Sequence, residues 1–247
     1  TLDMGGTSAD VALVRNYDLG ISSDRDVAGF PVKLPMVDIH TVGAGGGSIA
    51  WLERDGLMKV GPLSAGADPG PACYGLGGTK PTVTDANLVL GRLSSGGLIG
   101  GAMKLDVKAA QKAIQNIADK INLTLEKTAQ GIIGIVVANM VRAVRAISVE
   151  RGHDPREYAL MPFGGAGPLH GSEVARAMDM KEIIIPVAPG ILCAQGLITS
   201  DLKEDFVRSG RFKIDKSWPS QIKKIISELS QEAKIWLRGE KIPAANQ

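Results

Sequence analysis

The residues best suited to chemistry lie at the start of the chain, where a glycine turn separates two carboxylates. They are Asp3, Gly5, Gly6, Thr7, Ser8 and Asp10. Glycines let a ligand approach the main chain closely, and a turn of free amide N–H groups binds anions. Two carboxylates beside such a turn can hold Mg²⁺ through water against the same anion. The stretch therefore predicts a phosphate site with catalytic carboxylates at Asp3 and Asp10, and a plain hairpin turn is the alternative.

A second group of candidates surrounds the glycine cluster that follows a β-rich run. It consists of His40, Gly45, Gly46 and Gly47. Asp38 and His40 are two apart, so on a strand both side chains face one side, where they could contact substrate or, with Cys73, bind a metal. Two ligands do not make a metal site, and we favour a His40 that is hydrogen-bonded within the core. The glycine cluster is interpreted as a ligand-facing loop, because a hairpin and not the long helix of a dinucleotide site follows it.

A third group lies in the turn 164–167, between a strand predicted over 158–163 and a helix predicted from residue 168. A strand, a glycine turn and a helix start can place a nucleotide on exposed amides at the helix N-terminus. His170, in the first helical turn, is expected to form local hydrogen bonds rather than to act as a base. Gly164, Gly165 and Gly167 are therefore candidate nucleotide contacts, and a tight strand-to-helix turn without a ligand is the alternative.

Two further aspartates are candidates for contact with a substrate. Asp68 lies in a stretch rich in Gly and Pro, residues 61–78, which is predicted to be an ordered functional loop because its prolines stiffen it. Asp85 belongs to a short helix that is expected to begin at Thr84 or Asp85 and to end at Gly91. A capping role for Asp85 is favoured over a substrate contact.

The remaining patterns predict the strands and helices of an α/β protein, which must position these candidates. Strands are expected in the opening hairpin, around 21–23, 30–34 and 36–42, in a hairpin that turns at Asp55-Gly56, and over a buried run at 181–186. Helices are expected from a cap at Asp106 to about 121, from 125 to 151 with a stop at Gly152, over 190–198, and as an amphipathic helix over 220–238.

The composition is that of an ordinary globular protein, with 44% hydrophobic and 22% charged residues in a chain of 247. A formal net charge of +2 and only 4% aromatic residues give no reason to expect a nucleic acid partner. The most apolar run, residues 131–147, is interrupted by an Asn and two Arg residues. We expect it to fall short of the roughly 20 apolar residues of a membrane span.

The cysteines and the first residues bear on the cellular compartment. Cys73 and Cys193 have neither a disulfide framework nor metal-ligand spacing, so a reducing, cytoplasmic compartment is expected. Thr1 follows no charged and apolar leader. A start within a strand suggests that the chain is a fragment of a longer protein.

Five motifs occur in order along the chain. They are Asp3 to Val11, His40 to Ile49, Ser64 to Gly75, Pro81 to Asn87 and Phe163 to His170. The first motif is similar to the second phosphate loop of the actin, sugar kinase and heat-shock ATPase superfamily. Together the five resemble the hydantoinase A, oxoprolinase and acetone carboxylase family of ATP-dependent enzymes, and the resemblance runs from Thr1 to about Arg211.

The resemblance implies a fold. It is the ribonuclease-H-like fold of actin-like ATPases, a mixed sheet flanked by helices, with β-hairpin insertions. Residues 1–211 would form the second lobe of such an ATPase, and residues 212–247 a truncated helical extension of the same unit. The turn Gly164 to Gly167 would line the adenosine of ATP, and the opening hairpin would hold its phosphates and Mg²⁺. Family members carry an earlier lobe with a first phosphate loop, and that lobe is absent from this sequence.

The resemblance also implies a function. The chain would be the nucleotide-binding lobe of an enzyme that opens a cyclic amide, of the hydantoin or oxoproline type, with ATP hydrolysis. An ATP-dependent carboxylase subunit and a lobe that binds nucleotide without catalysis are alternatives. A sugar kinase or chaperone ATPase is disfavoured, because neither needs the glycine loop after His40 or the loop 68–74. The implied partners are an N-terminal lobe, a hydantoinase B-type subunit and a small cyclic amide, in an oligomer without nucleic acid or membrane.

Overall fold

The computed structural model describes residues 1–22, 25–27, 29–33, 36–211 and 217–243 of the chain. The chain divides into two compact units, Thr1–Gly196 and Leu197–Gln247. The boundary expected near residue 211 therefore lies inside the second unit. The ends of two predicted strands, Ser23 and Leu34, lie outside the described residues.

A mixed four-stranded sheet in the first unit has the order β12, β1, β2, β9. Its strands are β1 (Leu2–Met4), β2 (Ala9–Ala12), β9 (Ile39–Val42) and β12 (Pro162–Phe163). β2 is antiparallel to both β1 and β9, and β12 joins β1 in parallel. Because side chains alternate between the faces, Leu2, Met4 and Val11 are buried and Asp3 and Asp10 share the opposite face. The predicted opening hairpin and the mixed sheet are confirmed.

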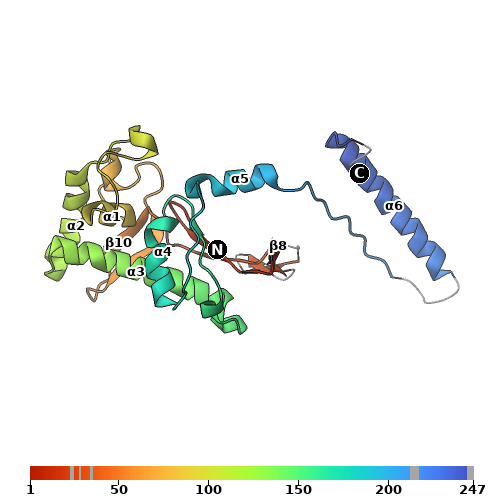
Figure 1. Ribbon diagram of the computed structural model, residues 1–247, viewed down its shortest axis with the longest axis horizontal. Coiled ribbons are helices and arrows are strands. Elements are labelled where there is room, and N and C mark those ends of the chain that lie inside the picture. The colour runs from red at the N-terminus through yellow and green to blue at the C-terminus, as the bar shows by residue number, and fades with distance from the viewer. Residues whose placement is uncertain (23–24, 28, 34–35, 212–216, 244–247) are drawn as a thin grey trace. The chain divides into compact units, whose positions relative to one another are not determined.

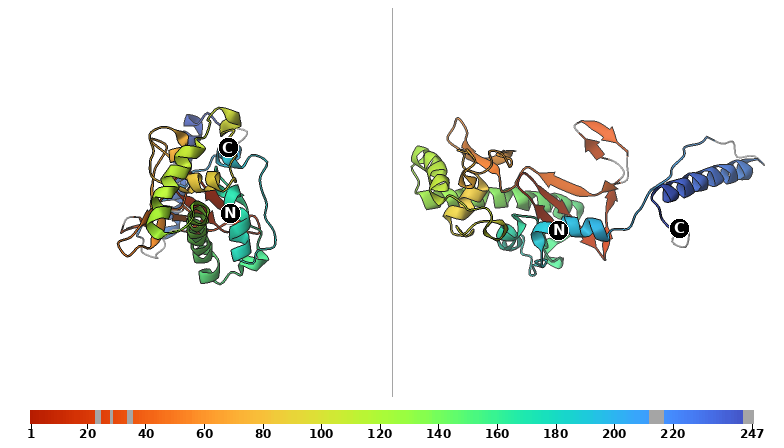
Figure 2. Two further views of the ribbon diagram at one scale, coloured as in Figure 1. Left: turned by 90° about the vertical axis from the view of Figure 1, so that its left-hand side faces the viewer. Right: turned by 90° about the horizontal axis from the view of Figure 1, so that it is seen from above.

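Several two-stranded pairs accompany this sheet, and those between residues 14 and 37 reach away from it (Figure 2). They are β3 (Val14–Arg15) with β4 (Asp18–Leu19), β5 (Ile21–Ser22) with β8 (Met36–Val37), and β6 (Arg25–Val27) with β7 (Phe30–Val32). A further hairpin joins β10 (Ser48–Leu52) to β11 (Met58–Ser64). It turns at Asp55-Gly56 as predicted, with a φ of 85° at Gly56.

Four helices pack on one another, and the third and fourth of them also pack on strands of the sheet (Figure 1). They are α1 (Val83–Val89), α2 (Val107–Ile121), α3 (Leu125–Ile147) and α4 (Gly167–Ala177). The long helix α3 contacts α1, α2 and α4 as well as strands β2, β9 and β11. The predicted cap of α2 is confirmed, because the Asp106 side chain accepts a hydrogen bond of 2.9 Å from the amide of Ala109.

Helix α3 differs from the prediction in two ways. It ends at Ile147, and a 3₁₀ turn over Val149–Arg151 leads to Gly152, which adopts the left-handed conformation. Taken with that turn, Leu125–Arg151 is long and apolar enough to cross a membrane, whereas the shorter run 131–147 was expected to fall short of a span. Half of its most apolar window is buried inside the protein, as in the core helix of a globular unit.

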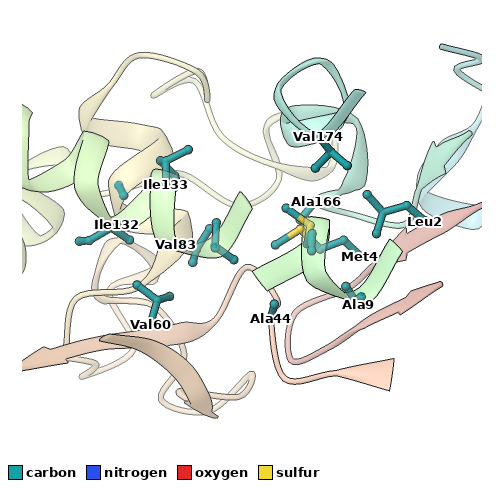
Figure 3. Close-up of a cluster of buried hydrophobic side chains, with 14 of the residues drawn as sticks. Leu2, Met4, Ala9, Ala44, Val60, Val83, Ile132, Ile133, Ala166 and Val174 are labelled. Carbon is teal, nitrogen blue, oxygen red and sulfur yellow. The ribbon is translucent and has the colours of Figure 1, made fainter. Parts of the chain in front are cut away.

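The core of the first unit lies between the sheet and α3 (Figure 3). Leu2 and Met4 from β1 are fully buried, together with Ile132 from α3 and Val83 from α1. Val174 brings α4 into the same cluster. This packing fixes the starts of α1 and α4 relative to the opening hairpin.

Two predicted strands are wrong in extent. Only Pro162–Phe163 of the run 158–163 forms a strand, and Leu160 makes one isolated parallel bridge to Ile183. The run 181–186 was expected to be buried, yet Ile184 is 53% exposed. A run of isoleucines has high β-propensity, but that preference depends on a neighbouring strand to pair and pack with. Within the described residues, that one bridge to Leu160 is the only strand pairing of this run.

Short helical segments complete the chain. The 3₁₀ helices are Ala72–Tyr74, Ile99–Gly101, Val149–Arg151, Pro155–Glu157 and Pro189–Ile191, and α5 covers Leu192–Thr199. In the second unit, α6 (Trp218–Gly239) is the predicted amphipathic helix. Arg208 forms ion pairs with Glu228, at 3.0 Å, and with Glu232 of this helix.

Candidate functional site

Segments from all five sequence motifs line one cavity of about 190 Å³. The hairpin turn, the glycine loop after β9, the loop before α1, α1 itself and the start of α4 each contribute to its wall. The lining residues are Gly5, Gly6, Gly46, Gly47, Gly66, Pro71, Tyr74, Thr84, Asn87, Leu93, Leu98, Gly165, Ala166 and Leu169. Residues as far apart in the sequence as Gly5 and Leu169 thus meet at the turn that the sequence singled out.

The glycine loop after β9 is fastened to the hairpin turn by backbone hydrogen bonds. Gly46 N donates to Gly5 O at 2.9 Å, and Gly47 N donates to Gly6 O at 2.6 Å. A Cβ at Gly45 would lie 2.5 Å from the amide nitrogen of Thr7. The residues Gly45 to Gly47 are buried. Their small size therefore allows two loops to pack together. Gly46 and Gly47 also line the cavity, and the substrate contact expected for the three glycines stays a prediction.

Three other glycines have free space where a side chain would be. A Cβ at Gly5, Gly6 or Gly165 would meet no other heavy atom within 4 Å. Each lines the cavity, so a ligand has room to approach the backbone there. The sequence expectation of backbone contact at these positions therefore agrees with the geometry.

The turn before α4 combines one open glycine with two packed ones. Gly164 has a φ of 81°, and a Cβ there would overlap Asp3 Oδ1 and the carbonyl of Met4. A Cβ at Gly167 would lie 3.3 Å from Leu2 O. The amide of Ala166 donates to Met4 O at 2.9 Å and so ties this turn to β1. Gly164 and Gly167 therefore serve strand–helix packing, and Gly165 is the position where the turn is open.

Asp85 anchors the loop that precedes α1. It is fully buried, and its carboxylate accepts hydrogen bonds from the amides of Ala72, Cys73 and Thr82 at 3.2, 2.8 and 2.9 Å. The N-cap of α1 is Thr82, whose side chain and that of Asp85 form a reciprocal capping box. The helix thus begins one residue before the range predicted, at Val83, and ends at Val89. The cap role of Asp85 is confirmed, and its burial leaves no surface for the substrate contact.

The carboxylates of Asp3 and Asp10 lie side by side on the sheet face opposite the core. The two residues are register partners on β1 and β2, so their side chains are neighbours. Thr41 Oγ1 donates to Asp10 Oδ1 at 2.5 Å, and Cys193 Sγ donates to Asp3 Oδ2 at 3.1 Å. The hydrogen bond to Asp3 raises the pKa of the Cys193 thiol. Within the described residues, no hydrogen bond is seen to Asp3 Oδ1 or Asp10 Oδ2, so each carboxylate keeps one oxygen for further ligands.

The remaining candidates do not join the cavity. His40 is exposed in β9, so the expected core position is wrong. Asp38 forms an ion pair with Arg151, and Cys73 is fully buried beside Asp85, where burial raises its pKa. In the described part of the chain no three His, Cys, Asp or Glu side chains gather as a metal site, which leaves the metal hypothesis for His40 without further ligands. Asp68 is exposed and does not line the cavity.

A buried polar pair, Asn87 and His170, was not assigned to the site by sequence reasoning. His170 is fully buried, and its Nε2 lies 3.2 Å from Asn87 Nδ2, which agrees with the local hydrogen bonding predicted for it. Burial lowers the pKa of His170 to about 4. Glu173 Oε2 lies 3.9 Å from its Nδ1, and Glu173 pairs with Arg92 at 2.7 Å. An Asn next to Ala86 and Leu88 in a short helix was the available signal, because such a residue is buried only with a partner.

The fold is that of an α/β protein in which a hairpin turn and the start of a helix line a small cavity. Cavities of this kind, with exposed backbone amides, commonly bind small molecules. Comparison with known proteins is more specific. The hydantoinase/oxoprolinase family model matches residues 1–206, and the chain belongs to this family.

Individual relatives agree with this assignment. The chain is 42% identical over 243 residues to caprolactamase subunit alpha of Pseudomonas jessenii, covering 97% of the chain and 35% of the relative. The crystal structure of ATP-dependent caprolactamase from that organism superposes with a TM-score of 0.74 and 40% identity, over 96% of the chain and 35% of the other. A nucleotide-free acetone carboxylase structure gives a TM-score of 0.76 and 33% identity, over 81% and 28%. The chain thus spans about a third of the length of these relatives.

Proposed function

We propose that the chain is the nucleotide-binding lobe, with an actin-like ATPase fold, of an enzyme that opens a cyclic amide with ATP hydrolysis. The observation that carries the proposal is the meeting of all five motifs at one cavity with open glycine backbone. Membership in the hydantoinase/oxoprolinase family and the likeness to an ATP-dependent caprolactamase support it. Cyclic amides of the hydantoin, oxoproline and caprolactam type are the substrate class.

The residues of the hairpin fit a nucleotide phosphate. Gly5 and Gly6 leave space above the backbone, and the hydroxyls of Thr7 and Ser8 follow in the same turn. The Gly5 amide donates to Ser8 O at 3.1 Å within the turn, so the amides that follow it and the two hydroxyls would donate to phosphate oxygens and stabilise negative charge as it develops on them. Gly165 would pack against the adenosine side of the same ligand, as the open space above it allows.

The carboxylates fit a magnesium ion. Mg²⁺ takes one or two carboxylates and completes its shell with water and phosphate oxygens, so a protein site of three ligands is not needed. Asp3 and Asp10 are neighbours beside the turn and keep free oxygens, which suits this arrangement. The ion would neutralise charge on the phosphates. Thr41 and Cys193 orient the two carboxylates by donating to them.

Other parts of the protein complete the proposed enzyme. The cavity is small for a whole nucleotide together with a substrate, since pockets for drug-sized ligands span roughly 300–1,000 Å³. We therefore propose that an N-terminal lobe supplies the other phosphate contacts and that a hydantoinase B-type subunit takes part in an oligomer. The cytoplasm remains the proposed location.

A carboxylase is the second candidate function. It is favoured by the likeness to acetone carboxylase, whose TM-score of 0.76 is close to the 0.74 of caprolactamase, at a lower identity of 33% against 40%. Both activities would use ATP to activate a small molecule, so the nucleotide site serves either. Incubation of the intact protein with MgATP and a cyclic amide, or with MgATP, bicarbonate and a ketone, followed by mass analysis of the products, would separate the two.

Titration calorimetry on the intact protein tests the proposed nucleotide site. We expect ATP to bind in the presence of Mg²⁺, and Asp10→Ala to weaken binding about tenfold or more, because a charged ligand of the ion is lost. Asp55→Ala, in the exposed turn of the β10–β11 hairpin, is the matched control and should bind as wild type. An Asp10→Ala protein with unchanged affinity and ATPase rate would refute the phosphate-loop assignment.

A further inference from the structure

The wall of the cavity holds a hydrogen-bond acceptor without a partner. Asn87 lines the cavity and is 1% exposed. In the described part of the chain, no group donates to its Oδ1. A buried acceptor left unpaired costs about 1–3 kcal/mol. Such an atom in a cavity wall therefore points to a donor on the molecule that fills the cavity.

The orientation of this amide is fixed by its other end. Asn87 Nδ2 donates to the carbonyl of Val83 at 3.1 Å and lies 3.2 Å from His170 Nε2. Turning the amide round would place Oδ1 against the Val83 carbonyl, two acceptors facing each other, so Oδ1 must be the free end. His170 Nε2 then accepts, and its proton is on Nδ1, which lies 3.9 Å from Glu173 Oε2 and has no hydrogen-bond partner among the described residues.

The rest of the wall describes the ligand that fits. Apolar side chains from Pro71, Leu93, Leu98 and Leu169 and the ring of Tyr74 face glycine backbone across about 190 Å³. Beside the hairpin turn that is proposed to hold phosphate, this space suits one flat ring system. An apolar wall together with the unpaired acceptor of Asn87 favours a ring that carries an N–H donor.

We propose that Asn87 Oδ1 accepts a hydrogen bond from an N–H on the ring of the bound ligand, and that His170 is the positioning residue that holds Asn87 in this orientation. The inference rests on the proposed function, which supplies two such ligands. One is adenine, with its exocyclic amine, and the other is a cyclic amide, with its ring N–H. Both present the same chemistry to Asn87.

Ligand pairs that differ at the donor test this inference on the intact protein with Mg²⁺. The first pair is ATP and purine riboside triphosphate, in which a hydrogen atom replaces the amine and no new N–H donor is introduced. The second is a cyclic amide and the lactone of the same ring size, in which oxygen replaces N–H. The wild-type protein should bind the member of one pair that carries the N–H donor roughly tenfold more tightly, because the other member leaves the buried acceptor without a hydrogen bond. The pair that shows the preference identifies which ring occupies the cavity.

Variants assign the preference to Asn87. Asn87→Ala should bring the affinity ratio of that pair close to one, and Asn87→Ser provides a second variant that keeps a small polar group in the wall. Asn139→Ala is the matched control, because Asn139 also donates to a backbone carbonyl, that of Val60 at 3.3 Å, but lies outside the cavity wall. Its ratio should equal that of wild type.

The positioning role of His170 has its own readout. His170→Gln offers Oε1 in place of Nε2 and should preserve the ratio, whereas His170→Leu should reduce it toward one while leaving the cavity lining in place. Equal binding within both ligand pairs by the wild-type protein would overturn the inference and leave nucleotide binding intact. An affinity ratio that stays at the wild-type value in both Asn87 variants would also overturn the inference. If the wild-type protein bound neither nucleotide nor cyclic amide, the proposed function would fall together with the inference.

Discussion

At the scale of single residues, glycines that look alike in the sequence have different structural roles. Gly164 and Gly165 are adjacent in the turn before α4, yet only Gly165 has open space on its outer side. Gly164 needs the left-handed conformation and lies against Asp3 and Met4. The sequence identified the turn as a candidate site, but it could not separate the two glycines, because the atoms that crowd Gly164 belong to β1.

This difference leads to a paired prediction. Gly165→Val should change the free energy of unfolding by less than about 1 kcal/mol, because no heavy atom meets its Cβ. It should abolish ATP binding by filling the space of the ligand. Gly164→Ala should destabilise by at least about 2 kcal/mol, from a disfavoured φ and overlap with β1. Thermal unfolding and calorimetry of both intact variants check this, and a Gly165→Val protein that still binds ATP would remove this turn from the site.

His170 gives a pH dependence of stability. In the folded protein its pKa is about 4 because burial disfavours the charged ring, whereas an unfolded histidine titrates near 6.5. Between these values the unfolded state binds more protons, so stability should fall as the pH drops from 6.5 to 4, by on the order of 3 kcal/mol. His170→Gln should lack this component. Unfolding curves of both proteins across this range measure it, and parallel loss of stability would contradict the assignment.

At the scale of elements, prediction succeeded where local signals were sufficient. α2 and α6 follow from amphipathic spacing, and the cap at Asp106 and the turn at Asp55-Gly56 depend only on neighbouring residues. The run 181–186 failed because strand formation needs a partner that the sequence pattern does not specify. The start of α1 was placed too late, since Thr82 and Thr84 are both plausible caps and only the reciprocal bond to Asp85 decides between them.

Asp85 connects two elements, and this gives a prediction for stability. Asp85→Ala should destabilise the protein by about 3–5 kcal/mol, because three buried amides and the Thr82 hydroxyl lose their acceptor at once. Asp106→Ala, which removes only one exposed cap bond, should cost about 1 kcal/mol. Denaturant unfolding of the intact variants measures both values. A similar loss for the two aspartates would mean that the loop 71–74 does not depend on Asp85.

At the scale of the whole molecule, the candidate residues gather from segments that only the fold brings together. The turn after β1, the loop after β9 and the start of α4 are separated by long insertions, and the parallel pairing of β12 with β1 places α4 beside the hairpin. The five motifs could be recognised in the sequence, but their meeting at one cavity depends on this pairing. Asn87 and His170 approach each other for the same reason, from α1 and α4.

The size of the cavity leads to a last prediction, about the division of binding between this chain and the rest of the protein. About 190 Å³ of glycine-lined space accommodates a ring system but leaves most of a nucleotide triphosphate without contacts. Each missing charge-assisted contact to phosphate corresponds to about 1.5–3 kcal/mol, or roughly tenfold or more in affinity. Residues 1–247, once shown by circular dichroism to be folded, should therefore bind MgATP at least about tenfold more weakly than the intact protein. Calorimetry on both measures the ratio, and equal affinities would mean that this chain contains the complete nucleotide site.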